Sequence, residues 1–129
     1  MTVKKGHDIL FGKNRLNINK DFITITEDII SGILLSVIVD CITANKSKST
    51  VKKEGKIWMV SKRKDWFDRC RIKERQFDRA INILKQMNIV DVKIWKYYGE
   101  PQQHISLNID VLKELLNDLN KNNQENSAS

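Results

Sequence analysis

Four polar residues have types and spacing that could read DNA bases. Arg75, Arg79, Asn82 and Gln86 stand at i, i+4, i+7 and i+11, so a helix would align them along one stripe. Arginine can donate two hydrogen bonds to guanine in the major groove, and asparagine or glutamine can make a paired contact with adenine. The predicted base-reading residues are Arg75, Gln76, Arg79 and Asn82. The plainer interpretation is a solvated helix face.

An apolar stripe on the same segment predicts the helix itself, over Glu74–Met87. Its members are Phe77, Ala80, Ile81, Leu84 and Met87. Asn88, just beyond, suits the left-handed conformation that ends many helices. Lys73, just before, is a poor helix cap, and its lack of a hydroxyl or carboxylate should loosen the helix start by about 1 kcal/mol.

Basic residues are concentrated just before this helix. Lys46–Arg75 holds 12 Lys and Arg against 4 Asp and Glu, a charge of +8, whereas the rest of the chain carries −1. A clustered positive charge attracts phosphate backbones, and such contacts set affinity and register without reading sequence. The predicted phosphate-binding residues are Lys62, Arg63, Lys64, Arg71 and Lys73. A solvated basic loop is the alternative interpretation.

A second candidate lies in a hairpin after the helix, where cations and aromatic rings occur together. Strands over Ile89–Tyr97 and His104–Asn108 flank a loop of residues 98–103. The predicted contacts of this hairpin are Lys93, Lys96, Tyr97 and Tyr98. They could follow a minor groove or backbone, or stack on unpaired bases. Alternatively, aromatic residues such as Trp95 simply pack on the sheet.

The order of these elements predicts the fold class. A strand over Lys56–Val60 precedes a short helix over Ser61–Arg69, with Ser61 as its N-cap, and a turn at 71–73 precedes Glu74–Met87. Strand, helix, turn, helix and hairpin is the order of a winged helix-turn-helix. We therefore predict an α/β (α+β) winged helix-turn-helix with a long N-terminal core helix and a C-terminal helix.

The flanking segments are predicted from patterning. Residues 1–20 read as an arm, with a strand near Phe22–Ile25 and Thr26 as the N-cap of an apolar helix reaching Ala44. That helix is either the core helix or in part a dimer interface. Residues 45–55 read as a polar loop, and residues 120–129 as a disordered polar tail. The domain therefore covers 21–119. The aromatic residues assigned to the core are Trp58, Trp66 and Phe67. The last helix is predicted from Leu112, Leu115, Leu116 and Leu119.

Composition narrows the class of protein. The apolar stretch 29–42 is shorter than the ~20 residues that span a bilayer, and no secretory signal is visible, so a cytoplasmic protein without a membrane partner is expected. Cys41 and Cys70 are expected to be reduced thiols. His7 and His104 have no carboxylate or thiol at ligand spacing, so neither a metal site nor a catalytic site is predicted. No glycine-rich loop indicates a nucleotide cofactor.

Several segments together resemble a known family. They are Leu34–Asp40, Gly55–Ser61 (GKIWMVS), Trp66, Ile72-Lys73 and Leu84–Ile89. Over roughly Phe22–Leu119 the chain is similar to the winged helix-turn-helix DNA-binding proteins of phages, plasmids and mobile elements of low-GC Gram-positive bacteria. Two positions depart from the family pattern: Lys73 stands where serine or threonine is usual, and Asn88 where glycine is usual.

The resemblance implies a non-enzymatic DNA-binding protein, of the replication initiator or replisome-organiser kind, with DNA and replication proteins as partners. Whether the DNA is single- or double-stranded stays open. One alternative is a transcriptional regulator that binds an operator as a homodimer, formed through the first or last helix. The other is a protein-interaction module that docks a replication helicase or polymerase.

Overall fold

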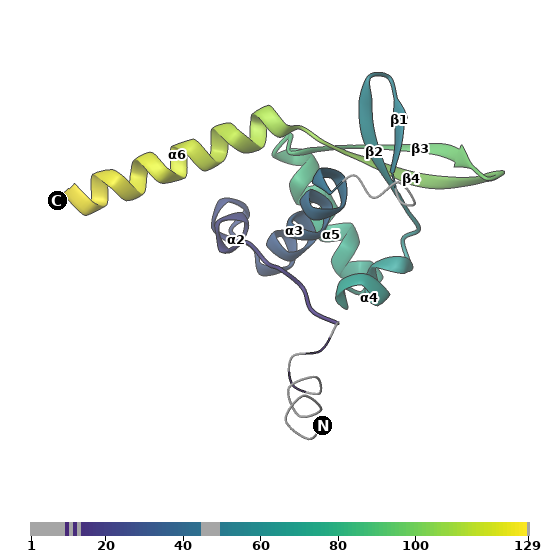
Figure 1. Ribbon diagram of the computed structural model, residues 1–129, viewed down its shortest axis with the longest axis horizontal. Coiled ribbons are helices and arrows are strands. Elements are labelled where there is room, and N and C mark those ends of the chain that lie inside the picture. Colours follow the sequence, from purple (N-terminus) through teal and green to yellow (C-terminus); the bar gives the residue numbers. More distant parts are fainter. Residues whose placement is uncertain (1–9, 11, 13, 45–49, 129) are drawn as a thin grey trace.

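The computed structural model describes residues 10, 12, 14–44 and 50–128, with side chains described as far as Asn122. Within these residues the fold is mixed α+β, with five helices and a four-stranded antiparallel sheet (Figure 1). The helices are α2 (Lys20–Thr26), α3 (Ile29–Thr43), α4 (Asp65–Cys70), α5 (Glu74–Gln86) and α6 (Ile109–Ala128). The strands are β1 (Thr50–Lys53), β2 (Lys56–Ser61), β3 (Val90–Tyr97) and β4 (Glu100–Leu107), in the order β1-β2-β4-β3. The predicted α+β class is confirmed.

Two tight turns set the register of the sheet. Glu54 and Gly55 join β1 to β2 with φ of 54° and 72°, and Tyr98 and Gly99 join β3 to β4 with φ of 49° and 81°. Two consecutive residues with positive φ are what a two-residue type I′ turn requires. Glycine adopts this conformation without strain, whereas glutamate and tyrosine do not. Each turn therefore has one favourable and one unfavourable residue.

One face of the sheet packs on α3 and α5. Met59 on β2 and Ile105 on β4 are paired in register and fully buried, and α3 covers them with Leu34, Leu35 and Ile38. The predicted apolar stripe of α5 is confirmed, because four of its members are buried and the fifth is partly buried. The four are Phe77, Ala80, Ile81 and Leu84.

The three aromatic residues predicted for the core differ in burial and in their position relative to the sheet. Trp66 on α4 is completely buried and stacks on Phe77, with ring centroids 5.2 Å apart. Trp58 is also buried, but it lies on the opposite face of the sheet from the core. The prediction for Phe67 is wrong, since its side chain is 47% exposed. The cause is the short α4, whose one buried face is already filled by Trp66 and Cys70.

The predicted strand near Phe22–Ile25 is wrong, because this segment is helix α2. β-branched residues favour strands, but local caps and packing on α3 outweigh that preference. The Asn19 side chain accepts a hydrogen bond from the Asp21 backbone N–H at 2.9 Å, and the Asn19 N–H donates to the Ser36 hydroxyl of α3 at 3.0 Å. Gly32 of α3 permits close contact, since a Cβ there would lie 2.7 Å from the Cα of Ile23.

Three predicted boundaries are also corrected. Thr26 ends α2 instead of capping α3, and the cap of α3 is Asp28, whose carboxylate accepts from the Ser31 N–H at 2.9 Å. Ser61 belongs to β2, and α4 begins at Asp65 because the Lys62 N–H is bound by the Asp65 carboxylate. The predicted loop 45–55 contains β1 from Thr50, and residues 45–49 lie outside the described residues. Strand β1 forms because the turn at Glu54–Gly55 brings it beside β2.

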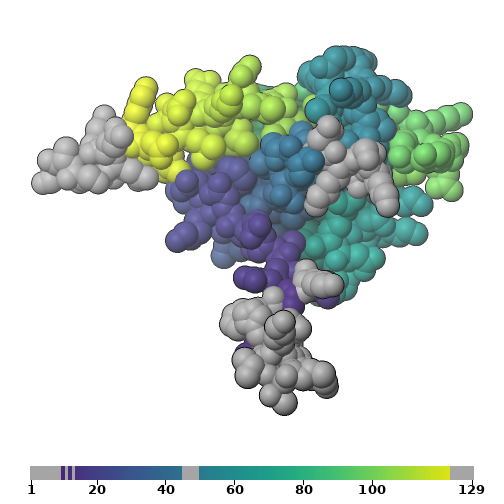
Figure 2. Space-filling model, viewed as in Figure 1, coloured from purple at the N-terminus to yellow at the C-terminus, as the bar shows by residue number. Residues whose placement is uncertain are grey.

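Helix α6 extends through the predicted disordered tail as far as Ala128. Its C-terminal part projects from the rest of the molecule (Figures 1 and 2). The segment contains neither proline nor glycine, and Lys, Gln and Glu are compatible with a helix, so nothing local ends it at Leu119. Leu112 is buried against the body of the protein, and Leu115, Leu116 and Leu119 are partly buried. None of the helices described is long and apolar enough to cross a membrane.

Candidate nucleic-acid interface

The polar stripe of α5 lies opposite its buried stripe and is exposed. Arg75, Asn82 and Gln86 face solvent, and Arg79 is also exposed. Within the part of the chain that the structure describes, Arg75 has no ion pair or hydrogen bond from its side chain. The predicted end of this helix is confirmed, because Asn88 has a φ of 61°. The sequence pattern thus places this face of the helix correctly.

Gln76 has a structural contact that the sequence did not reveal. Its Oε1 accepts a hydrogen bond from the Lys73 N–H at 2.9 Å, and its side chain is partly buried. Lys73 has no side-chain acceptor for the free amides of the first turn, so Gln76 supplies one from inside the helix. Its predicted role in base reading would require this bond to break, which sets it apart from Arg75.

Arg79 joins α5 to the start of α3. Its Nη1 donates to the Asp28 Oδ1 at 2.9 Å, while the same carboxylate caps α3. Partial burial raises the pKa of Asp28, but hydrogen bonds from Ser31 and from Arg79 outweigh it, so the pKa lies below its ordinary value of 3.8. Arg79 thus leans towards α3, at one side of the stripe. Only the part of the Arg79 side chain that remains exposed is available to a ligand.

Two variants of Asp28 should separate the contribution of its negative charge to stability from the contribution of its capping hydrogen bond on α3. Asp28→Ala is expected to lower the free energy of unfolding by about 1 kcal/mol at neutral pH, because the cap of α3 is lost. Asp28→Asn keeps an oxygen acceptor and should lose less. Because folding lowers the pKa of Asp28, its charge stabilises the fold above 3.8 and this contribution disappears as the pH falls through the lowered value.

Urea unfolding at neutral pH and at about pH 2 measures both effects. The gap between the wild type and Asp28→Asn should close at the lower pH, whereas Asp28→Ala should stay the least stable. A gap between wild type and Asp28→Asn that is equal at both pH values would contradict the role of the charge.

Arg63 lies beside the first two turns of α5. Its Nε donates to the Asp78 Oδ1 at 2.9 Å, and its Nη1 donates to the Glu74 Oε2 at 3.2 Å. The hydrogen bond from Arg63 holds the pKa of Asp78 below its ordinary value. Carboxylates on this helix would repel a phosphate backbone, and Arg63 neutralises part of that charge. The guanidinium of Arg63 is therefore engaged in contacts within the protein, although Arg63 was predicted to bind phosphate.

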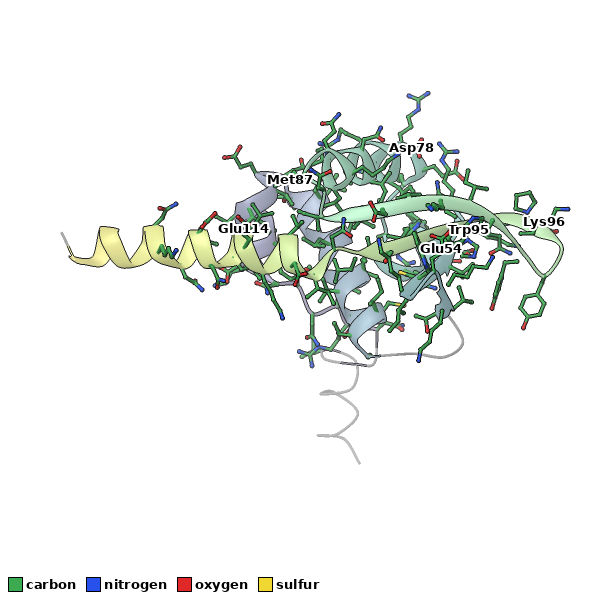
Figure 3. All side chains as sticks on the ribbon, turned by 90° about the horizontal axis from the view of Figure 1, so that it is seen from above. Glu54, Asp78, Met87, Trp95, Lys96 and Glu114 are labelled. Carbon is green, nitrogen blue, oxygen red and sulfur yellow. The ribbon has the colours of Figure 1, made fainter. Side chains whose placement is uncertain are left out.

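The segment Lys62–Lys64 also lies beside the β3–β4 hairpin. The Lys62 ammonium is 3.6 Å from the Glu100 carboxylate, and a hollow of about 470 Å³ separates the segment from the hairpin strands. Lys64 is exposed, and its side chain has no ion pair or hydrogen bond with any of the residues described. Figure 3 shows Asp78 on α5 and Lys96 near the end of the hairpin. The start of α5, the segment Lys62–Lys64 and the hairpin therefore adjoin one another.

The four predicted hairpin residues divide between two faces of the sheet. Lys96 follows Ile94 on the face that looks towards the helices, because alternate residues of a strand share a face. Lys93 and Tyr97 lie on the other face, where Lys93 pairs with Glu54 at 3.2 Å. Tyr98, at the turn, is 90% exposed. Only Lys96 and Tyr98 are thus well placed to act together with α5.

The outer face of the sheet carries an aromatic cluster of Trp58, Trp95 and His104. The two indoles meet edge to face with centroids 4.8 Å apart and an interplanar angle of 73°, and Trp95 meets His104 at 5.1 Å. Lys53 and Lys93 lie over the Trp95 ring at 4.6 and 5.4 Å. The alternative interpretation of Trp95, packing on the sheet, is confirmed. The sequence patterns did not predict that Trp58, Trp95 and His104 form one cluster.

Arg71 is occupied at the end of α4. It has a φ of 63°, and its Nη1 donates to the Phe67 carbonyl at 2.9 Å, so it closes the last turn of that helix. Its guanidinium also lies over the exposed Phe67 ring at 5.2 Å. Arg71 remains exposed but is held at the helix end. Both cysteines are buried free thiols, and in the described part of the chain no group of His, Cys, Asp and Glu could hold a metal ion.

Comparison with known proteins gives no relative for this chain. No family model matches it, and neither does any curated protein or any solved structure. We therefore base the proposed function on the geometry of the start of α5, the segment Lys62–Lys64 and the β3–β4 hairpin.

Proposed function

We propose that this chain is a non-enzymatic DNA-binding protein of the winged helix-turn-helix type that serves the replication of a mobile element, plasmid or phage. The arrangement of β2, α4, α5, β3 and β4 supports the winged fold, with β4 lying between β2 and β3. The observation that carries the proposal is the exposed stripe of α5 beside the segment Lys62–Lys64 and the β3–β4 hairpin. The replication role rests on the sequence resemblance alone.

Each part of the interface has a separate task in this proposal. Arg75, at the N-terminal end of the exposed stripe, and Asn82, near its middle, enter the major groove and contact base edges. Lys62 and Lys64 contact phosphates and fix the position of the helix. Lys96 and Tyr98 contact the adjacent groove or backbone. Arg63 holds Glu74 and Asp78, which reduces repulsion between these carboxylates and the DNA.

The first experiment is a fluorescence anisotropy titration of labelled single-stranded and double-stranded DNA of mixed sequence at two salt concentrations. We expect binding of the duplex that weakens steeply as salt rises, because phosphate contacts release counterions. Preference for the single strand would indicate base stacking instead of groove reading. No binding of either form at low salt would reject the proposal in favour of a protein-interaction module.

Tyr98 is expected to lower the stability of the fold and to strengthen DNA binding. It is a large residue at positive φ and is 90% exposed, so its conformation destabilises the fold without any burial in return. Asparagine suits this turn position. Tyr98→Asn should therefore raise the free energy of unfolding by about 0.5–1 kcal/mol. It should also weaken DNA binding by about fivefold, because a ring contact is lost.

The turn at Glu54 provides the matched control for this prediction. Glu54 stands at the same position of the other two-residue turn, with a φ of 54°. Glu54→Asn relieves the same backbone strain but also breaks the exposed ion pair with Lys93, so it should stabilise the fold by less than Tyr98→Asn and should not weaken DNA binding. Thermal melting and anisotropy measure the two properties. If Tyr98→Asn binds DNA as tightly as Glu54→Asn does, the hairpin tip is not part of the interface.

A further inference from the structure

The hollow between the basic segment and the hairpin has the composition of a ligand site. Its volume of about 470 Å³ lies within the ~300–1,000 Å³ range of small-molecule sites. Ile94, 67% exposed, and Pro101 supply apolar surface. Lys62, Arg63 and Lys64 supply positive charge at the rim, and Glu100, 3.6 Å from the Lys62 ammonium, offsets part of it.

Gln103 also lines this hollow and has an unused hydrogen-bonding atom. Its Oε1 is buried and has no partner within the described residues. A buried acceptor without a donor costs about 1–3 kcal/mol, so a rotation of the amide that brings the oxygen out to a donor on a ligand recovers that free energy. A glutamine amide carries an acceptor and a donor side by side and can exchange them by rotation. This is the geometry that pairs with the edge of a nucleobase.

We propose that this hollow receives one unpaired nucleobase of the bound DNA. The proposal deepens the proposed function and rests on it. The flat faces of a base fit the apolar surface of Ile94 and Pro101, and its polar edge meets the Gln103 amide. The phosphate attached to that base lies within the positive rim formed by Lys62 and Lys64. A base within the duplex stack keeps its pairing edge occupied, so only a base outside the stack can enter.

The test compares three labelled duplexes of one sequence by anisotropy: fully paired, with one adenine bulge, and with one abasic bulge. The abasic bulge bends and flexes like the adenine bulge but offers no base. The wild type should bind the adenine bulge about tenfold more tightly than the other two. Gln103→Leu, which keeps the side-chain bulk without the amide, should bind all three alike.

Asn120→Leu is the matched control, because it also replaces a side-chain amide by leucine, and Asn120 is exposed on α6, away from the residues that line the hollow. It should keep the tenfold preference, and circular dichroism melting should show both variants folded. Equal binding of the three duplexes by the wild type would overturn the base site and leave the proposed function intact. A preference that survives in Gln103→Leu, or one shared by the abasic bulge, would also overturn it. Failure to bind even the paired duplex at low salt would reject both proposals.

Discussion

Gly32→Ala is expected to lower the free energy of unfolding by about 3 kcal/mol, although alanine is the better helix former by about 1 kcal/mol. The added Cβ would lie 2.7 Å from the Cα and 2.8 Å from the backbone N of Ile23. Backbone atoms cannot rotate away as a side chain can, so α2 must move off α3. That movement exposes Phe22, which is now only 5% exposed. Urea unfolding followed by circular dichroism measures the loss.

Gly55→Ala distinguishes crowding from conformational strain. Gly55 has a φ of 72°, but a Cβ there would meet nothing within 4 Å, so the only effect is the cost of that conformation. We expect a loss of about 1 kcal/mol. If Gly32→Ala is no less stable than Gly55→Ala, then α2 and α3 do not approach as closely as described.

The double variant Lys64→Ala/Arg75→Ala should bind mixed-sequence duplex on the order of 10- to 100-fold more weakly than the wild type at moderate salt. Both side chains are exposed and have no partner within the described residues, so their removal breaks no internal contact. The slope of log affinity against log salt should become shallower by about 0.9, since the phosphate contact of Lys64 is lost and Arg75 contacts base edges. Anisotropy over a series of salt concentrations measures affinity and slope together.

Lys113→Ala/Lys121→Ala removes the same charge from the exposed side of α6 and serves as the control. A general decrease in the positive field would affect both double variants alike, because each loses two positive charges. We expect the α6 variant to bind nearly as the wild type does. Equal weakening of the two variants would mean that binding follows net charge and that the face of α5 has no special part.

Local patterns were enough to predict α5 and its end at Asn88, because periodicity and turn chemistry act over a few residues. Strand β1 and helix α2 were missed for the opposite reason. A segment such as Phe22–Ile25 has strand-forming residues, and only its caps and its packing on Gly32 make it helical. The sheet order and the pairing of β2 with β4 follow from contacts distant in sequence, which periodicity does not report.

In the candidate site, too, contacts between residues distant in sequence could not be predicted. Exposure of the α5 stripe could be predicted, but the ion pair of Arg79 joins residues 51 positions apart, and the contacts of Arg63 reach past α4 to α5. The division of Lys93 from Lys96 follows from alternation along the predicted strand Ile89–Tyr97, but the two residues were grouped together as contacts of the hairpin tip. Gln103 gave no signal, because its significance lies in a missing partner.

The edge-to-face pair of Trp58 and Trp95 has an optical consequence. Indoles with centroids 4.8 Å apart and planes inclined at 73° share their electronic excitations, and a fixed angle between them gives a circular dichroism signal that neither ring produces alone. Trp58 belongs to β2 and Trp95 to β3, with β4 between them. The signal therefore exists only when three strands are assembled, so the protein carries its own spectroscopic reporter of sheet formation, on the face turned away from α5.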